Sequence, residues 1–220
     1  NGPFLTDDEG KKIVGWMTPD KTETQAMVGN LRYAFPFTSG SIQDAIDSIY
    51  NSGQPGTVVL AGVPYSITSD ITLRPGVSLM GVLGNFTFSG YVPDENPQTV
   101  SGTIFNLSAG VIGLKYNNVD QANPVPAELA ATGCASVTID GITFIGGLRG
   151  IHTGAKNVLG LLFSTVRNCR FYNQTAEHYV FENFMQCNFG NLFCWNSLPG
   201  VVAGGMVFNN SRLRDGGGTI

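Results

Sequence analysis

The densest group of side chains able to do acid–base chemistry lies in the segment RFYNQTAEHYVFE, residues 170–182. Hydrolysis of a glycosidic bond needs two carboxyl groups, about 5–5.5 Å apart for retention or about 6.5–9.5 Å apart for inversion. Eliminative cleavage of a uronic acid needs instead a base such as His, Tyr, Lys or Arg near the sugar carboxylate. We therefore predict three catalytic side chains, Glu177, Glu182 and His178, and three glycan-binding side chains, Tyr172, Tyr179 and Arg170.

The local backbone decides whether these residues can act together. Glu177 and Glu182 are five residues apart, so a continuous strand would place them on opposite faces, whereas a turn between them would bring both outward. The alternative is a pair of surface carboxylates beside a surface or hydrogen-bonded His178. Asp140 is expected at a turn beside core positions, and His152 in a loop between glycines. Because no motif with an unambiguous mechanism is present, no metal site and no cofactor is predicted.

Composition limits the class of protein. The chain of 220 residues is 42% hydrophobic, so it can bury a sizeable core. Only 13% of its residues are charged and 29 are glycine, which favours a β-rich chain with frequent tight turns. The net charge of −4 and the absence of a Lys/Arg cluster argue against nucleic acid as a partner. No run of about 18 apolar residues occurs, so no membrane insertion is expected.

Residues 1–37 show no sustained periodicity, and we predict that they form an N-terminal arm or linker with a short strand at Lys12–Met17. The domain that follows, residues 38–220, is expected to open with a helix. Ser41 and Asp44 have the spacing of a capping box at its start, and Gly53 and Pro55 end it. Its apolar stripe is spaced at i, i+3, i+4 and i+7, at Ile42, Ala45, Ile46 and Ile49.

Short β segments follow this helix and are separated by turn signals. They are too short for an ordinary sandwich, so we expect the chain to wind as a coil. The four segments are Thr57–Leu60, Tyr65–Thr68, Ile71–Leu73 and Val77–Gly81.

A repeat in the second half supports the coil. Four similar segments end at Phe144, Phe171, Phe189 and Leu213, at intervals of 27, 18 and 24 residues. Such intervals are typical of a solenoid whose loops differ in length. Equivalent positions of successive coils should then stack on one another.

Two rows of equivalent residues follow from this alignment. One places Cys169 beside Cys187, as buried thiols or, at a strand spacing of about 4.8 Å, as a disulfide. None of the four cysteines, including Cys134 and Cys194, belongs to a CxxC pair, so no zinc site or thioredoxin-like motif is expected, and buried free thiols are the main interpretation. The other row lies at a corner of the coil, where amide side chains can stack, and consists of Gly141, Asn168, Gln186 and Asn210.

The opening SIQDAID, followed by GTVVLAGVPYSITSDITLRPGVSLMGV, resembles the start of the pectate-lyase-like superfamily and of many phage tailspikes. In those proteins a helix plugs the end of a solenoid, and G-x-Y-x-I and G-V-x-L-x-G segments form the first rungs. Val63 and Pro64 depart from the first pattern. The resemblance implies an all-β fold, a right-handed single-stranded parallel β-helix with a short N-terminal capping helix. The matching residues are Gly62, Tyr65, Ile67, Gly76, Val77, Leu79 and Gly81.

The same resemblance implies a function. The chain is most similar to the N-terminal part of a bacteriophage tailspike or capsule depolymerase, a homotrimer in the virion tail that binds and cleaves capsular polysaccharide or lipopolysaccharide. The alternatives are a secreted pectinase-, glucanase- or epimerase-type enzyme on the same fold, and a non-catalytic glycan-binding adhesin or structural spike. Because RLRDGGGTI follows the last repeat without a capping element, we also expect the β-helix to continue or to be covered by a partner.

Overall fold

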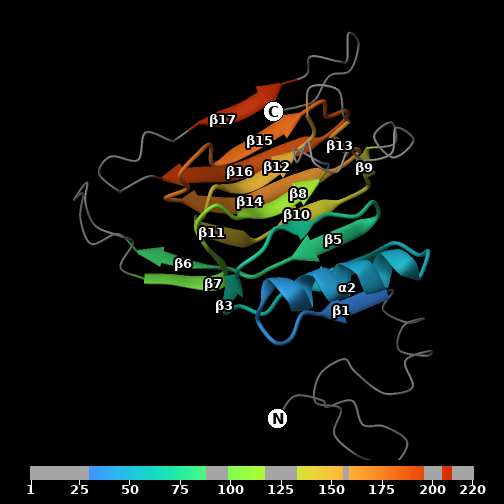
Figure 1. Ribbon diagram of the computed structural model, residues 1–220, viewed down its shortest axis with the longest axis horizontal. Coiled ribbons are helices and arrows are strands. Elements are labelled where there is room, and N and C mark those ends of the chain that lie inside the picture. The colour runs from blue at the N-terminus through green and yellow to red at the C-terminus, as the bar shows by residue number, and fades with distance from the viewer. Residues whose placement is uncertain (1–29, 88–98, 117–132, 156–158, 196–204, 210–220) are drawn as a thin grey trace, which may run out of the picture.

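The computed structural model describes residues 30–87, 99–116, 133–155, 159–195 and 205–209. These residues form a mostly β structure with one helix and a curled parallel sheet (Figure 1). The predicted strand at Lys12–Met17 and the last repeat at Leu213 lie outside the described residues. Within the described part, no helix is long and apolar enough to cross a membrane.

The helix α2, Ser39–Asn51, buries the predicted stripe of Ile42, Ala45, Ile46 and Ile49. Its start differs from the prediction, because Thr38 is the N-cap and forms the capping box with Ser41. Ser41 therefore occupies the third helical position and does not begin the helix. The Thr38 hydroxyl accepts from the Ser41 amide at 3.3 Å, which satisfies an amide that has no partner within the helix.

Three groups of strands run along the molecule. The ten-stranded sheet contains β1 (Asn30–Tyr33), β2 (Gly56–Val59), β3 (Pro64–Ile67), β5 (Val77–Met80), β6 (Leu83–Thr87), β7 (Thr99–Leu107), β10 (Thr138–Asp140), β11 (Ile142–Gly146), β14 (Thr165–Tyr172) and β16 (Asn188–Trp195). The five-stranded sheet contains β4 (Ile71–Thr72), β8 (Ile112–Tyr116), β12 (Arg149–Thr153), β15 (Tyr179–Glu182) and β17 (Met206–Asn209). The third pair is β9 (Cys134–Ala135) with β13 (Leu161–Leu162).

The chain passes repeatedly from one sheet to the next, as expected for a coil. After β11 it enters β12 of the five-stranded sheet, then β13, and returns to the ten-stranded sheet at β14. The described strands pair in parallel except β6 and β7, which form an antiparallel pair. Each strand therefore lies beside a strand from an earlier or later turn of the chain. The four short segments predicted after α2 correspond to β2, β3, β4 and β5.

An aromatic column fills the interior. The register aligns Tyr65, Phe105, Phe144 and Phe171 on successive strands, and all four side chains are fully buried. Neighbouring ring centroids are 5.7, 5.4 and 5.1 Å apart. These separations are those of favourable aromatic pairs and are close to the spacing between strands. The column ends beside Cys194 of β16.

The predicted repeat is correct for its first step and wrong for its second. Phe144 pairs with Phe171 as expected, but Phe171 pairs with Cys194 and not with Phe189. Consequently Cys169 lies beside Leu192, and the predicted stack of Cys169 on Cys187 does not form. All four cysteines are free, and Cys194 is the one that is not fully buried.

Backbone geometry explains this error. Gly141, Asn168 and Asn191 share a corner position and all have positive φ, at 72°, 54° and 52°. Asn tolerates this conformation better than most residues because its short side chain bonds locally. The predicted corner row is therefore right at Gly141 and Asn168, but its next member is Asn191 and not Gln186.

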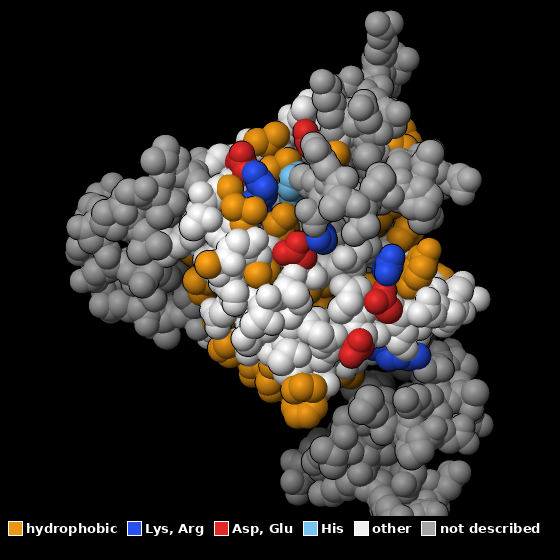
Figure 2. Space-filling model, viewed as in Figure 1, with side chains coloured by type: hydrophobic (Ala, Val, Ile, Leu, Met, Phe, Trp, Pro, Cys, Tyr) orange, Lys and Arg blue, Asp and Glu red, His pale blue; other side chains and the backbone are white. Residues whose placement is uncertain are grey.

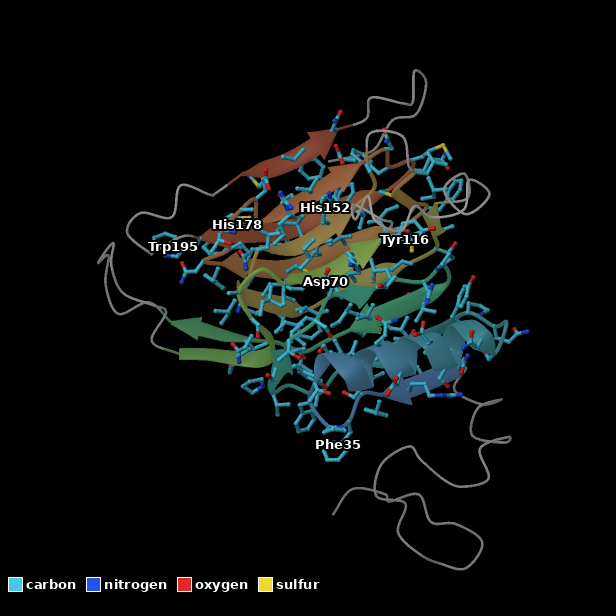
Figure 3. The ribbon with its side chains drawn as sticks, in the orientation of Figure 1. Phe35, Asp70, Tyr116, His152, His178 and Trp195 are labelled. Atoms are coloured by element: carbon cyan, nitrogen blue, oxygen red, sulfur yellow. The ribbon has the colours of Figure 1, made fainter. Side chains whose placement is uncertain are left out.

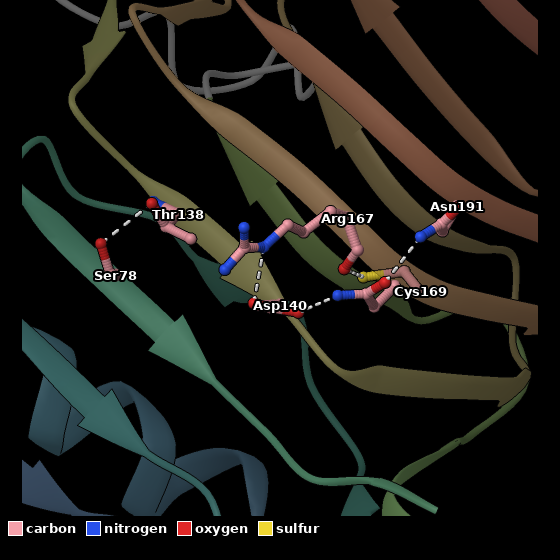
Figure 4. Close-up of polar contacts among 7 residues, drawn as sticks. Ser78, Thr138, Asp140, Arg167, Cys169 and Asn191 are labelled. Carbon is pink, nitrogen blue, oxygen red and sulfur yellow. Dashed lines mark hydrogen bonds and ion pairs between the residues drawn. The ribbon is translucent and has the colours of Figure 1, made fainter.

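Side chains at this corner form a chain of hydrogen bonds, the polar ladder, made of Asp140, Arg167, Asn168 and Asn191. Asp140 accepts from Arg167 Nε at 2.7 Å, a contact marked in Figure 4. It also accepts from Asn168 Nδ2 at 2.8 Å, and Asn191 Nδ2 donates to Asn168 Oδ1 at 3.0 Å. Asp140 lies beside core residues, as predicted, but it is the last residue of β10 and not in a turn, and it bridges successive coils.

Candidate functional site

The five-stranded sheet positions the two predicted glutamates. Tyr179 and Phe181 of β15 pack in the core, so the side chains between and after them face the opposite side of the sheet. Glu182 ends this strand, whereas Glu177 precedes its first residue by two positions. Because β15 begins at Tyr179, the two glutamates do not lie on one continuous strand, so strand alternation does not force them onto opposite faces. Their side chains are 37% and 21% exposed, respectively.

Both glutamates contact the neighbouring strand β12. Glu177 Oε2 accepts from Arg149 Nε at 2.7 Å. Glu182 Oε2 lies 3.9 Å from His152 Nε2, and its Oε1 accepts from Asn209 Nδ2 at 3.3 Å. We call Arg149, His152, Glu177 and Glu182 the β12–β15 polar group. Figure 2 shows a histidine side chain at the surface, next to basic and acidic side chains.

The electrostatics of Glu177 favour its ionised form. A hydrogen bond from its own backbone amide lowers the pKa of the Glu177 carboxyl, and the Arg149 guanidinium lowers it further, while partial burial opposes both. An ionised carboxylate at this position can accept a proton, or attack an electrophilic carbon, at neutral pH.

His152 is the residue that the sequence reasoning missed. It lies in β12 rather than in a loop, with 5% of its surface exposed. Burial, and then the nearby Arg149, lower the pKa of His152 to about 4, with Glu177 opposing, so the imidazole is neutral at pH 7. Its Nδ1 is buried and has no hydrogen-bond partner.

A signal for His152 was present in the repeat. Phe144 and Phe171 are partners, and 171 − 144 = 27 residues separate them. Adding the same 27 residues to Arg149 and His152 gives positions 176 and 179, each one residue short of Glu177 and Val180. The observed partner of His152 is Val180.

The other predicted site residues lie elsewhere. His178 is buried, with its Nδ1 2.5 Å from Gln174 Oε1, and burial lowers its pKa. Tyr179 is also buried and its hydroxyl donates to Met206 Sδ at 2.7 Å. Figure 3 shows His178 and His152 at separate places along the sheet. The structure therefore places His152, and not His178, beside Glu182, and Glu177 is near enough to affect the charge of His152.

Two predicted residues belong to the ten-stranded sheet. Tyr172 ends β14 and is fully buried, and burial raises its pKa. Arg170 Nη1, on the same strand, donates to the carbonyl of Gly84 at 2.9 Å. The roles of Arg170, Tyr172 and Tyr179 in glycan binding stay predictions.

A second ion pair lies on the neighbouring strand of the same sheet. Lys115 of β8 pairs with His152 in the register, and its Nζ is 2.7 Å from Asp70 Oδ2. The other Asp70 oxygen accepts from the Ile112 amide at 2.8 Å. Within the described ranges, no three His, Cys, Asp or Glu side chains gather so that they could hold a metal ion.

Comparison with known proteins shows a fold similarity. No protein-family model and no curated protein matches the sequence. A solved structure of Geobacillus virus E2, ORF18, is similar over 80% of this chain, with a TM-score of 0.53 and 14% identity. The similar region covers 33% of the viral protein, so the chain spans about a third of its length. This chain therefore shares its fold with part of a viral protein.

A second solved structure, a Parabacteroides merdae protein provisionally described as a glycosyl hydrolase, is matched over 77% of this chain and 92% of its own length. The identity is again 14%, and the TM-score is 0.23. At that score the match carries no argument about this chain.

Proposed function

We propose that this chain is part of a phage tailspike-type protein that binds and cleaves a bacterial surface polysaccharide. In this proposal the coil is a right-handed parallel β-helix of the pectate-lyase-like type, capped by α2. The right hand is favoured because about 98% of parallel crossover connections have it. The catalytic carboxyl groups are Glu177 and Glu182.

The observation that carries the proposal is the β12–β15 polar group. Two partly exposed carboxylates contact Arg149 and His152, three residues apart on one strand, and the His152 imidazole is buried and neutral. Two carboxyl groups are the usual requirement for glycoside hydrolysis. A rigid parallel sheet is a suitable support, because sites on regular elements hold their geometry better than sites on loops.

The virion context is supported by the fold shared with the protein of Geobacillus virus E2. A homotrimer and a place in the virion tail are proposed with it, from the resemblance to tailspikes. A trimer resistant to detergent and salt on electrophoresis is the expected result. A monomer at micromolar concentration would contradict this part of the proposal.

The function is tested by incubating the full-length protein with a panel of capsular polysaccharides and lipopolysaccharides. We expect release of oligosaccharides from at least one glycan, measured by chromatography and mass spectrometry. Tight binding without release from any glycan would favour the non-catalytic adhesin. Cleavage of plant pectin or glucan in preference to bacterial glycans would favour the secreted enzyme.

A further inference from the structure

A second corner of the coil carries three exposed side chains in a row. It lies where the chain leaves the β9–β13 pair and turns toward the ten-stranded sheet. The register pairs Ala135 with Leu162, and Leu162 with Met185, so the residues that follow them share one corner position on successive coils. We call these residues the exposed corner row, and they are Ser136, Phe163 and Gln186.

The backbone of this row is left-handed throughout. Ser136, Phe163 and Gln186 have φ values of 58°, 49° and 49°. The amides of Ser136 and Phe163 donate to the carbonyls of the next coil at 2.9 Å, so the stacking of the coils fixes this conformation. A bulky side chain rarely adopts positive φ, because its Cβ atom then lies too close to the backbone. Phe163 is therefore strained at a position where Asn or Gly would not be.

The corner of the polar ladder shows which residues such a backbone prefers. Its positions are occupied by Gly141, Asn168 and Asn191, which all tolerate positive φ. Phe163 has no such tolerance, and packing does not compensate for it, because 55% of its surface is exposed. Among the described residues it also contacts no other aromatic ring. A strained side chain that packs so little calls for a role outside folding.

The neighbours of Phe163 on the row indicate which ligand it suits. Ser136 presents a hydroxyl and Gln186 an amide, both exposed, one on each side of Phe163 at the strand spacing of about 4.8 Å. A sugar ring has an apolar C–H face and polar hydroxyl groups around its edge. The apolar face can pack on the Phe163 ring while the hydroxyls bond to the two polar neighbours. Because no side chain of the row is charged, the sugar unit that fits is an uncharged one.

The same arrangement argues against a protein partner at this corner. Proteins usually bind one another through contiguous apolar patches. The exposed corner row has a single apolar side chain between two polar ones, which matches the mixed surface of a sugar better than that of a protein core.

We propose that the exposed corner row is a glycan-binding subsite in which Phe163 packs against an uncharged sugar unit of the polysaccharide. This inference rests on the proposed function and adds a contact outside the β12–β15 polar group. Glu182 and Gln186 are four residues apart, so at most about 14 Å separates their Cα atoms. One polysaccharide chain can therefore contact both places.

The subsite is tested with three variants at one position and two purified capsular polysaccharides from the panel, one neutral and one acidic. Phe163→Tyr keeps an aromatic ring, Phe163→Leu keeps only a bulky apolar side chain, and Phe163→Asn suits positive φ. We expect Kd for the neutral polysaccharide, measured by calorimetry, to rise on the order of tenfold in Phe163→Leu and Phe163→Asn, as for the loss of one aromatic contact. Phe163→Tyr should bind like the wild type.

Unfolding in urea separates binding from packing. Phe163→Asn should unfold at a higher urea concentration than the wild type, because it relieves the positive φ of a bulky residue. A lower midpoint would show that the ring stabilises the fold, and it would overturn the argument from strain.

The remaining outcomes distinguish this subsite from the proposed function. Equal affinity of all three variants, wild-type binding of the acidic polysaccharide alone, or a changed oligomeric state in Phe163→Asn would overturn the subsite. Each of these results would leave polysaccharide binding by the wild type intact. If the wild type binds neither these two polysaccharides nor any other glycan of the panel, the proposed function itself fails.

Discussion

The polar ladder and the β12–β15 polar group are built on successive coils of the same chain, yet they differ in how completely their members bond. In the ladder, the contacts from Arg167 and Asn168 to Asp140 and from Asn191 to Asn168 are all 2.7–3.0 Å. In the β12–β15 polar group, Glu177 is equally well bonded to Arg149. His152 and Glu182, however, are 3.9 Å apart, and His152 Nδ1 has no partner.

This difference separates structural from functional polar groups. Buried polar atoms are nearly always hydrogen-bonded, so one that is not calls for an explanation such as a ligand or a catalytic role. The side chains of the ladder form hydrogen bonds with one another, and these bonds stabilise a corner of the coil. The β12–β15 polar group has unused bonding capacity and partly exposed carboxylates, and therefore can interact with a further molecule.

The largest contrast is expected in activity. Glu177→Gln should lower the rate of glycan cleavage by about 10²–10⁴-fold, the usual contribution of a positioned acid or base. Asp140→Asn changes a carboxylate in the ladder by the same chemistry and should leave the rate unchanged. Initial rates on the cleaved glycan measure both. Equal losses in the two variants would show that the contrast between the two polar groups is wrong.

The next contrast is expected in stability, where a substitution in the ladder should have the larger effect. Asn168→Ala removes the hydrogen bonds to Asp140 and from Asn191 and places Ala at a φ of 54°. We expect the free energy of unfolding to fall by about 2–3 kcal/mol, from the lost bonds and the left-handed backbone together. Urea unfolding followed by circular dichroism measures this loss.

Asn168→Gly provides the matched control, because Gly adopts positive φ without a steric penalty but cannot form the two hydrogen bonds. Its loss should be smaller than that of Asn168→Ala. If both variants lose the same free energy, the positive φ at this corner contributes nothing to the preference for Asn.

The sequence predicted much of the fold because its signals are periodic. The stripe of α2, the short strands and the step from Phe144 to Phe171 follow from spacing alone. The next step failed because FMQCNF resembles VRNCRF in its letters, whereas the register depends on the corner residue. The corner position of Asn168 is continued by Asn191 and not by Gln186. Both residues have positive φ, and the spacing of apolar residues does not show which of them lies at the corner.

The candidate site was predicted only in part, for a related reason. Proximity along the chain placed His178 beside Glu177, but His178 points into the structure and bonds Gln174. The histidine near the glutamates, His152, comes from the preceding coil. Contacts between coils depend on the exact offset between repeats, which loops of unequal length conceal in one sequence.

A smaller effect is expected from the protonation of His152. Its pKa is about 4 in the folded protein and about 6.5 when unfolded, so the unfolded chain binds more protons between these values. The stabilisation by the neutral imidazole is therefore present above pH 6.5 and is lost as pH falls toward 4. In His152→Gln, the unfolding free energy should decrease less steeply over this window.

His178 should also make stability depend on pH, because burial lowers its pKa as well. A residual slope should persist in His152→Gln and decrease further when His178→Gln is added. Unfolding in urea at several pH values between 4 and 7 gives the slopes. A slope in His152→Gln equal to that of the wild type would contradict the burial of a neutral imidazole at this position.

The smallest effect is expected for the exposed end of the ladder. Arg167 pairs with Asp140 at 2.7 Å, but its side chain is 53% exposed, so water and salt screen the attraction. Arg167→Gln should lower the free energy of unfolding by less than about 1 kcal/mol, and this loss should shrink further in 1 M salt. Asp140 would keep its bond from Asn168, which holds the corner. A loss as large as that of Asn168→Ala would mean that charge, and not the amide row, stabilises the ladder.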